Sequence, residues 1–322
     1  MATAVDSVSG ARARSFISKI RAGDQVACLV TLLFAATIIA VTILLAMELW
    51  THSHASRVKF GMGFLTSSSW DPVNDNFGAM PFIYGTIVTS IVALLISVPL
   101  GVGAAIFLSE LAPPRLSNVF TFLVELLAAV PSVIFGLLAI FALVPPMRTY
   151  VQPFLMKTLG WIPLFSGPAY GVGVLTASIV LAIMTFPYII SISREALIQV
   201  PPEQREAALA LGATRWEATW DAVVPFAKLG IMGSVFLSLA RALGETMAVT
   251  MVIGNEPKIH ASLLAPGYTI AAVIANEFTE ATGDLYLSAL VELGLVLFLI
   301  TIVLNGMGRL LIIATTKPGA SR

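Results

Sequence analysis

Long uninterrupted apolar runs are the feature that most restricts this chain. We place six of them, at 25–48, 81–110, 118–146, 170–193, 229–254 and 285–313. A run of about 18 or more apolar residues is long enough to cross a bilayer as a helix. Only 11% of the residues are charged, whereas a soluble domain carries about 25%. The sequence therefore predicts an all-α, polytopic membrane protein with six transmembrane helices.

A basic segment precedes the first apolar run and contains Arg12, Arg14, Lys19 and Arg21. A basic stretch before an apolar one is also typical of a signal peptide. This run, however, extends to Met47, and no small-residue cleavage site clearly follows it. We therefore expect an uncleaved first helix. The single cysteine, Cys28, lies inside this run and cannot form an internal disulfide.

Proline and glycine interrupt two of the expected spans. They are Pro99, Gly101 and Gly103 in the second span, and Pro131 and Gly136 in the third. Such breaks are tolerated in a bilayer where neighbouring helices or water satisfy the freed backbone groups. We therefore expect these spans to line a path. The stretch 147–169 is short, aromatic and proline-containing, and we expect an interfacial segment there instead of a seventh span.

Lysine and arginine are distributed unevenly between the two sides of the membrane. If the N-terminus is cytoplasmic, the outer side carries only Arg57, Lys59, Arg148, Lys157 and Lys258. The inner side carries Arg12, Arg14, Lys19, Arg21, Arg115, Arg194, Arg205, Arg215, Lys228, Arg309, Lys317 and Arg322. Basic residues are enriched on the cytoplasmic side of membrane proteins. The sequence therefore predicts that both termini and the stretch 195–227 are cytoplasmic.

Residues 195–227 form a polar stretch between two apolar spans. We expect two short amphipathic helices here, broken near Gly212. Pro201 and Pro202 mark the beginning of the first helix, where proline is tolerated. Small side chains leave one surface of this helix narrow, so it fits the groove of a partner protein. The alternative is an ordinary cytoplasmic hairpin between two spans.

Within this stretch, Glu206, Ala207 and Ala208 are followed by Gly212 and, at the end, by Pro225. The pattern resembles the coupling motif of ABC importer permeases, which docks on a separate ATPase. The aliphatic residues just before Pro225 are smaller than is usual in that motif. The resemblance implies that Glu206, Ala207, Ala208 and Gly212 form the contact with the ATPase.

Charged residues occur inside the expected spans. Arg241 and Glu245 lie four apart in the fifth span, on one helical face if the helix is continuous. Glu125 lies in the third span and Glu292 in the sixth. An ionised group at bilayer depth costs about 2.5–3.5 kcal/mol, so it normally pairs or faces water.

Two interpretations of these charges remain open. Arg241 and Glu245 could simply neutralise each other. Alternatively, Arg241 could face an anion path, with Glu245 or Glu125 holding it when the path is empty. A guanidinium suits an oxyanion because its planar fork donates two hydrogen bonds at once. We favour the path and assign Glu292 to helix packing.

Other classes of function are disfavoured by the sequence. It contains no Gly-x-x-x-x-Gly-Lys-Ser/Thr loop, so ATP binding in the P-loop manner requires another subunit. We therefore expect no cofactor in this chain, with ATP and magnesium on the partner ATPase. The three histidines, His52, His54 and His260, form no His-Glu-x-x-His motif, which argues against a metalloenzyme. The formal net charge is zero, which gives no reason to expect nucleic acid.

Three stretches, at 70–90, 125–136 and 241–255, go beyond a general permease pattern. Together they resemble the permeases of phosphate-specific ABC importers of the PstC type, over roughly residues 60–310. The resemblance implies a type I importer bundle in the bacterial inner membrane, and it carries the family's membrane arginine and glutamate onto Arg241 and Glu245. It also implies that the transported ion is phosphate.

The same resemblance implies several partners. They are a related permease of the PstA type, an ATPase dimer of the PstB type, an external binding protein of the PstS type and, in some cases, a phosphate-sensing signalling complex. Alternatives are a permease for sulfate or molybdate, and an anion transporter that works without ATP. The expected organisation is an N-terminal segment at 1–24, a first helix and outer loop at 25–80, the importer domain at 81–313, and a tail at 314–322.

Overall fold

The computed structural model describes residues 3–315, with side chains from residue 26 onward except at 311, 314 and 315. The expected tail at 314–322 and the side chains of the N-terminal segment at 1–24 therefore lie outside the described part. The chain divides into two compact units, Met1–His52 and Ser53–Arg322. We describe each unit by itself.

The first unit is one helix, α1 (Thr3–His52). Its residues Val26–His52 are apolar enough and long enough to cross a membrane. Thr31, Thr37 and Thr42 donate their hydroxyls to backbone carbonyls four residues earlier, at 2.8–2.9 Å. These bonds satisfy the polar side chains inside the helix itself. A helix that is apolar on all sides is typical of a membrane span.

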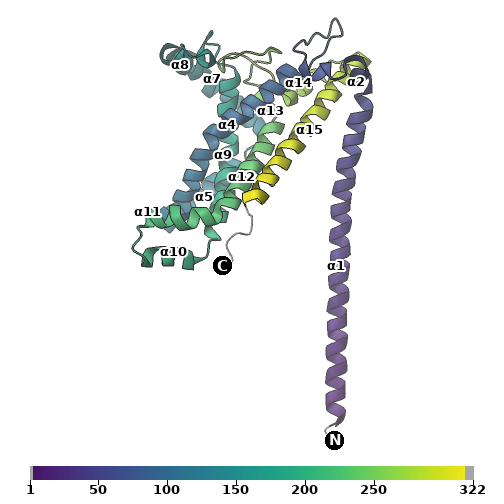
Figure 1. The fold of residues 1–322 in the computed structure, drawn as a ribbon, viewed down its shortest axis with the longest axis vertical. Helices are drawn as coiled ribbons and strands as arrows, with labels where there is room; N and C mark the ends of the chain where they lie inside the picture. The colour runs from purple at the N-terminus through teal and green to yellow at the C-terminus, as the bar shows by residue number, and fades with distance from the viewer. Residues whose placement is uncertain (1–2, 316–322) are drawn as a thin grey trace. The chain divides into compact units, whose positions relative to one another are not determined.

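Four long helices form the centre of the second unit: α4 (Met80–Ile106), α9 (Val174–Ile198), α12 (Val224–Gly244) and α15 (Asp284–Thr315) (Figure 1). The most extensive packing is between α4 and α9, and α12 packs against both. In the most apolar stretch of α9, 61% of the residues are buried, a larger share than in any other span. The helix α9 is therefore the central one.

The approach of α4 to α9 depends on a small residue. A side chain at Gly101 of α4 would overlap that of Ile189 on α9. Small residues at such crossings let two backbones approach closely, which is how membrane helices gain packing energy without a hydrophobic driving force. The glycine noted in the sequence as a break is therefore used for packing inside a continuous helix.

The expected third span, 118–146, is divided in the structure. Helix α5 (Pro114–Ala128) ends before Pro131, and a new helical run begins at Ser132. This run continues through α6 (Ser132–Leu138), η2 (Ala139–Leu143), α7 (Val144–Pro146), η3 (Met147–Val151) and α8 (Gln152–Leu159). The break follows from Pro131, which cannot donate a helical hydrogen bond.

The segment expected at the interface, 147–169, differs from that expectation in its first part. Residues 147–159 continue the membrane-length helix Ser132–Leu159. Only the later part leaves it, through the short turn η4 (Pro163–Phe165). Pro145 and Pro153 lie inside this run, each just after a π-helical turn (η2 and η3), and do not end it.

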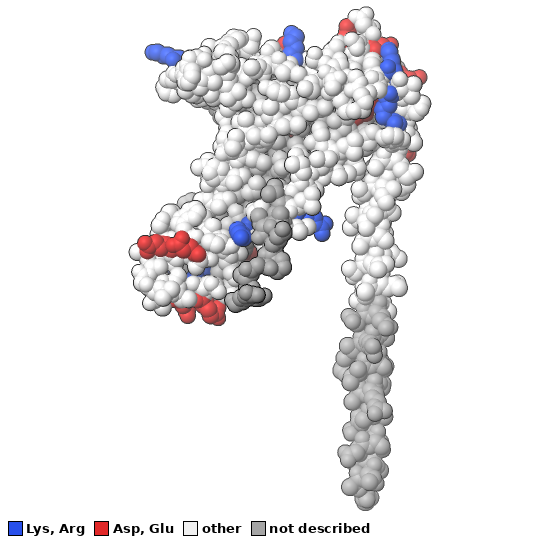
Figure 2. All heavy atoms as spheres, viewed as in Figure 1, with Lys and Arg blue, Asp and Glu red and all other residues white. Residues whose placement is uncertain are grey.

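Short elements occupy the two ends of the second unit. At one end lie α2 (His54–Phe60), α3 (Gly63–Thr66), α8 and α14 (Ile270–Glu277), and at the other lie α10 (Pro202–Ala210) and α11 (Arg215–Ala218) (Figure 1). In the second unit, charged side chains gather at these ends, with uncharged atoms between them (Figure 2). This distribution is typical of a bundle that crosses a bilayer.

An aromatic cluster closes the α14 end. The Trp70 ring makes edge contacts with those of Phe77 and Phe82, at centroid distances of 4.9 and 4.8 Å. Its indole nitrogen and the Tyr286 hydroxyl both donate to Oε2 of Glu277, at 2.9 and 2.6 Å. The loop that follows α3 is therefore fixed onto α14 and α15.

The expected class is confirmed. The described residues form helices and isolated bridges, without a strand, and six helical segments are long and apolar enough to cross a membrane. Glu292 on α15 is 5% exposed, as its assignment to helix packing requires.

Candidate anion path and coupling loop

The fifth span is not one continuous helix, which corrects the expected range 229–254. Helix α12 ends at Gly244, and Glu245 has an extended backbone with φ −70° and ψ 125°. A short helix, α13 (Met247–Thr250), follows. Arg241 therefore lies in the last turn of α12, while Glu245 lies in the break and does not share its helical face.

Arg241 contacts an aromatic ring. Its guanidinium carbon lies 4.3 Å from the centroid of the Tyr188 ring, on α9. The face of an aromatic ring is electron-rich and attracts a cation. Among the described residues, no ion pair links Arg241 to Glu245 or to Glu125. The structure therefore shows Arg241 against an aromatic ring and without an ion pair to either carboxylate in this part of the chain.

Tyr188 is itself held in place by a third helix. Its hydroxyl donates to the carbonyl oxygen of Ala128 at 3.2 Å, where α5 ends. That carbonyl belongs to the last turn of a helix, where carbonyls lack partners within the helix. One side chain therefore connects the break after α5 with the break after α12.

Glu245 and its neighbours satisfy the freed backbone of the break. The Ala248 backbone N–H donates to Oε1 of Glu245 at 3.4 Å, at the start of α13. The Thr246 hydroxyl donates to the Gly244 carbonyl at 3.2 Å, and that of Thr250 donates to the Thr246 carbonyl at 2.7 Å. Both threonine hydroxyls therefore already bond to the backbone.

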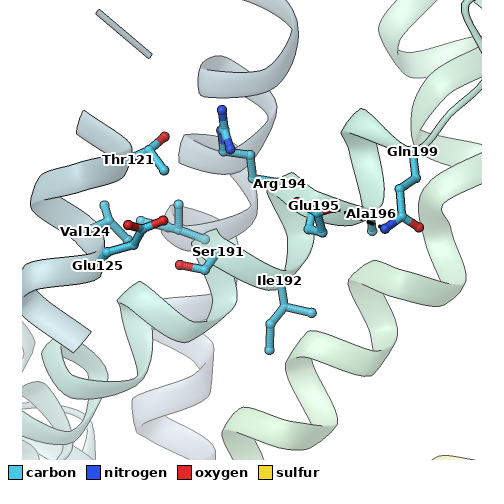
Figure 3. A pocket seen from close by; sticks show the side chains of 10 residues that line it. Thr121, Val124, Glu125, Ser191, Ile192, Arg194, Glu195, Ala196 and Gln199 are labelled. Atoms are coloured by element: carbon cyan, nitrogen blue, oxygen red, sulfur yellow. Dashed lines mark hydrogen bonds between the residues drawn. The ribbon is translucent and has the colours of Figure 1, made fainter. Parts of the chain in front are cut away.

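Glu125 lies in a crevice between α5 and α9 with a volume of about 490 Å³ (Figure 3). Its charged neighbours there are Arg194 and Glu195. The Nε of Arg194 is buried without a hydrogen-bond partner, and Nη2 donates to Ser117 at 3.4 Å. Glu125 and Arg194 thus line one crevice. The sequence counted Arg194 only as an inner-side charge, because nothing local shows that α5 packs beside it.

The two expected helices of the polar stretch are present, as α10 and α11. Between them Gly212 has φ +92°, a conformation that glycine adopts without strain. Glu206 and Ala207 are exposed on α10, and Ala208 is half-buried. Beside them Leu211 is 90% exposed. An exposed apolar side chain therefore lies beside the residues of the predicted coupling motif.

The second short helix begins with a capping box. The backbone N–H of Glu217 donates to the Thr214 hydroxyl at 3.3 Å, and the Thr214 backbone N–H donates to Oε2 of Glu217 at 2.7 Å. Two N–H groups that a helix start leaves free are thereby satisfied. Trp216 and Trp220 follow with ring centroids 5.6 Å apart, so they share one face.

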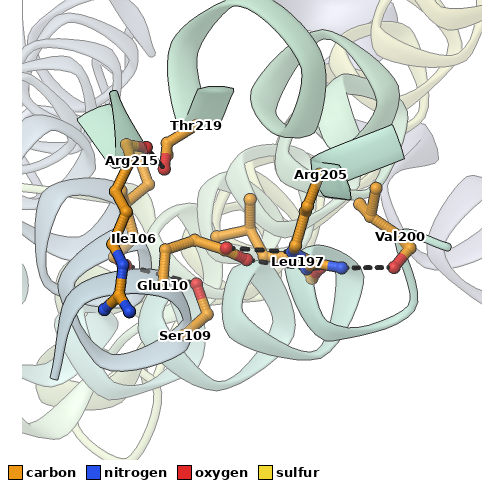
Figure 4. Close-up of polar contacts among 8 residues, drawn as sticks. All are labelled: Ile106, Ser109, Glu110, Leu197, Val200, Arg205, Arg215 and Thr219. Atoms are coloured by element: carbon orange, nitrogen blue, oxygen red, sulfur yellow. Dashed lines mark hydrogen bonds and ion pairs between the residues drawn. The ribbon is translucent and has the colours of Figure 1, made fainter. Parts of the chain in front are cut away.

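Arg205 precedes Glu206 but points inward. Its Nε and Nη2 donate to the two carboxylate oxygens of Glu110 at 3.0 and 2.7 Å (Figure 4). Glu110 lies on η1 (Phe107–Leu111), which continues α4. The hydrogen bonds and the charge of Glu110 raise the pKa of Arg205 above its ordinary value. Sequence reasoning missed this pair, because its partners are 95 residues apart.

Comparison with known proteins defines the class of this bundle. The family described as binding-protein-dependent transport system inner membrane component matches residues 97–314. The chain therefore belongs to this family of transport permeases, and it is a multi-pass membrane protein.

Within that class, the chain is similar to the phosphate transport system permease protein PstC of Mesorhizobium japonicum, with 49% identity over 85% of this chain and 86% of the relative. The same protein of Xylella fastidiosa (strain Temecula1) is 45% identical over 90% of each chain. These similarities confirm the resemblance that the sequence motifs carry.

A solved structure supports the fold independently. In the inward-facing MetNI methionine ABC transporter, one chain matches 73% of this chain and 95% of its own length, with a TM-score of 0.55 and 16% identity. At that identity the likeness concerns the fold alone. The expected fold class, an all-helical ABC importer permease, is confirmed.

Proposed function

We propose that this chain is the permease subunit of an ATP-driven importer that moves inorganic phosphate across the bacterial inner membrane. The observation that carries the proposal is Arg241, a cation at membrane depth that an aromatic ring holds and that pairs with no carboxylate among the described residues. The relatives named phosphate transport system permeases support phosphate as the cargo.

Chemistry favours an oxyanion at this position. The guanidinium of Arg241 offers a planar fork of N–H donors. Tyr188 contacts it through the face of its ring, and this contact leaves the N–H groups able to donate to a ligand. Arg241 is exposed on the isolated chain. A second permease, of the PstA type, would therefore complete the path. Glu245 and Glu125 would limit how tightly the anion is held, so that it passes on.

The positive-inside distribution supports the orientation. The end with α10 and α11 would face the cytoplasm, as would both termini, and the end with α14 would face outward. An external binding protein of the PstS type would dock on the outward end. A signalling complex that senses phosphate is compatible with this arrangement.

The coupling loop, residues 195–227, would contact a cytoplasmic ATPase dimer of the PstB type. Glu206, Ala207, Ala208 and Gly212 form the docking surface, supported by the exposure of Leu211 beside them. ATP and magnesium bind on that partner, since this sequence has no P-loop. The chain itself is a transport subunit without catalytic residues.

The proposal is tested by phosphate uptake into vesicles that contain the complete importer. A charge-assisted hydrogen bond contributes about 1.5–3 kcal/mol, so Arg241→Gln should lower uptake about 10- to 150-fold. Assembly and ATP binding should stay intact. Unchanged uptake by this variant would exclude Arg241 from the path.

Two further arms separate the alternatives. Sulfate and molybdate compete with labelled phosphate only if the cargo is a broader class of oxyanion. Glu206→Lys should abolish co-purification of the ATPase or its coupling to uptake. Persistent, ATP-independent uptake in that variant would instead indicate an anion transporter without a motor.

A further inference from the structure

The coupling loop is joined to the membrane helices through one side chain. Besides its ion pair with Glu110, Arg205 donates from Nη1 to the Val200 carbonyl at 2.6 Å and from Nη2 to the Leu197 carbonyl at 2.8 Å. Leu197 lies in the last turn of α9, and Val200 just after it. A single guanidinium therefore holds α10, η1 and the end of α9 together (Figure 4).

Only an arginine meets the requirements of this junction. Its four hydrogen bonds use three nitrogens in one plane, a geometry that a lysine ammonium lacks. The bond to Val200 satisfies a carbonyl just beyond the end of α9, and the bond to Leu197 joins the one that its carbonyl already accepts from the Val200 N–H. The Glu110 side chain is 10% exposed and that of Arg205 26%. The pair is therefore shielded from water and from salt.

The junction also leads to the candidate anion path through packed helices. Helix α9, which Arg205 holds at one end, carries Tyr188, and Tyr188 contacts Arg241. Helix α4, which continues into η1 and Glu110, packs along α9. Arg205 thus connects α10 to both helices by direct hydrogen bonds.

We propose that Arg205 and Glu110 form a latch that transmits the movement of α10 to α4 and α9. Arg205 acts here as a positioning residue. It does not bind phosphate or the ATPase, whereas its neighbour Glu206 faces the partner. The latch rests on the proposed function, because it requires that the loop docks on a motor. A pair that only stabilises the hairpin would affect assembly but not the ratio of transport to ATP hydrolysis.

The test measures phosphate moved per ATP hydrolysed by the complete importer in proteoliposomes. Arg205→Lys keeps the charge but loses the fork, and Glu110→Gln keeps the shape but loses the charge. Coupling between distant sites changes equilibria about 5- to 150-fold, so we expect each variant to lower this ratio at least about fivefold. ATPase co-purification should be unchanged. The double variant should be no worse than either single one, because both remove the same connection.

Arg115→Lys is the matched control, since Arg115 is exposed at the start of α5, outside the coupling loop, and forms no ion pair among the described residues. It should keep the wild-type ratio. Should Glu110→Gln fail to assemble, Glu110→Asp keeps the charge and withdraws the carboxylate by one methylene. A wild-type ratio in assembled Arg205 and Glu110 variants would overturn the latch. ATPase binding in Glu206→Lys is measured separately. Failure of the docking proposal can therefore be distinguished from failure of the latch.

Discussion

The guanidinium of Arg241 lies over the ring of Tyr188, whose hydroxyl donates to the carbonyl of Ala128. Three helices, α5, α9 and α12, therefore meet at one tyrosine. The ring orients the cation, while the hydroxyl binds the end of a neighbouring helix. These two roles of Tyr188 can be separated by substitution.

We expect Tyr188→Phe to keep most phosphate uptake, because the ring face remains. Tyr188→Leu removes the ring, and a cation–π contact contributes about 0.5–2 kcal/mol, so uptake should fall about 2- to 30-fold. Uptake into vesicles at equal amounts of assembled complex checks this. Equal losses in both variants would assign the role to the hydroxyl bond with Ala128 instead.

Gly85 and Gly103 lie on the same helix, α4, in opposite surroundings. A side chain at Gly85 would overlap the backbone carbonyl of Tyr268, whereas nothing lies near Gly103. Overpacking of this kind costs about 1–3 kcal/mol, so Gly85→Ala should lower the melting temperature of the purified complex. Gly103→Ala is the control and should leave it unchanged or raised, since alanine favours helix over glycine. A melting temperature equal to wild type in Gly85→Ala would contradict the close approach.

Gly212 separates the two helices of the coupling loop with a positive φ. A residue with a side chain pays about 1–2 kcal/mol there, although the space around the position is open. Gly212→Ala should weaken ATPase binding about 5- to 30-fold in a titration of the permease with the ATPase. Gly212→Asn should weaken it less, because asparagine adopts this conformation more readily. Identical affinity in Gly212→Ala would show that the turn conformation is not needed for docking.

Asp71 lies in the loop between α3 and α4, where Asn74 and Val73 donate to its carboxylate. The Asn74 side chain donates at 2.7 Å, and together with the backbone N–H groups it lowers the pKa of Asp71. The turn is therefore favoured above the ordinary aspartate pKa and loses this contribution as the pH falls through the lowered value. Asn74→Ala should raise the pKa of Asp71 toward its ordinary value. A carboxyl NMR titration, assigned with Asp71→Asn, measures this, and an unchanged pKa in Asn74→Ala would contradict it.

Local signals made the coupling loop predictable. Pro201, Pro202 and Gly212 set the ends of α10 through backbone geometry, which a sequence displays directly. The break after Gly244 was missed, because the apolar pattern continues through Glu245 without a proline. That break is associated with α13 packing against α6, a contact between distant segments. The pairs Arg241–Tyr188 and Arg205–Glu110 likewise depend on which helices meet.

The extended residue Glu245 has a consequence for hydration. It leaves Gly244 exposed and the backbone between α12 and α13 outside helical bonding at membrane depth. Backbone of this kind is stable in a membrane only inside protein or beside a water-filled cavity. Gly244 is exposed on this chain, so in the assembled importer either another subunit covers this backbone or a water-filled path lies beside it. In the second case, an anion that arrives at Arg241 would exchange part of its hydration shell for the guanidinium, and it would not have to lose the whole shell at once.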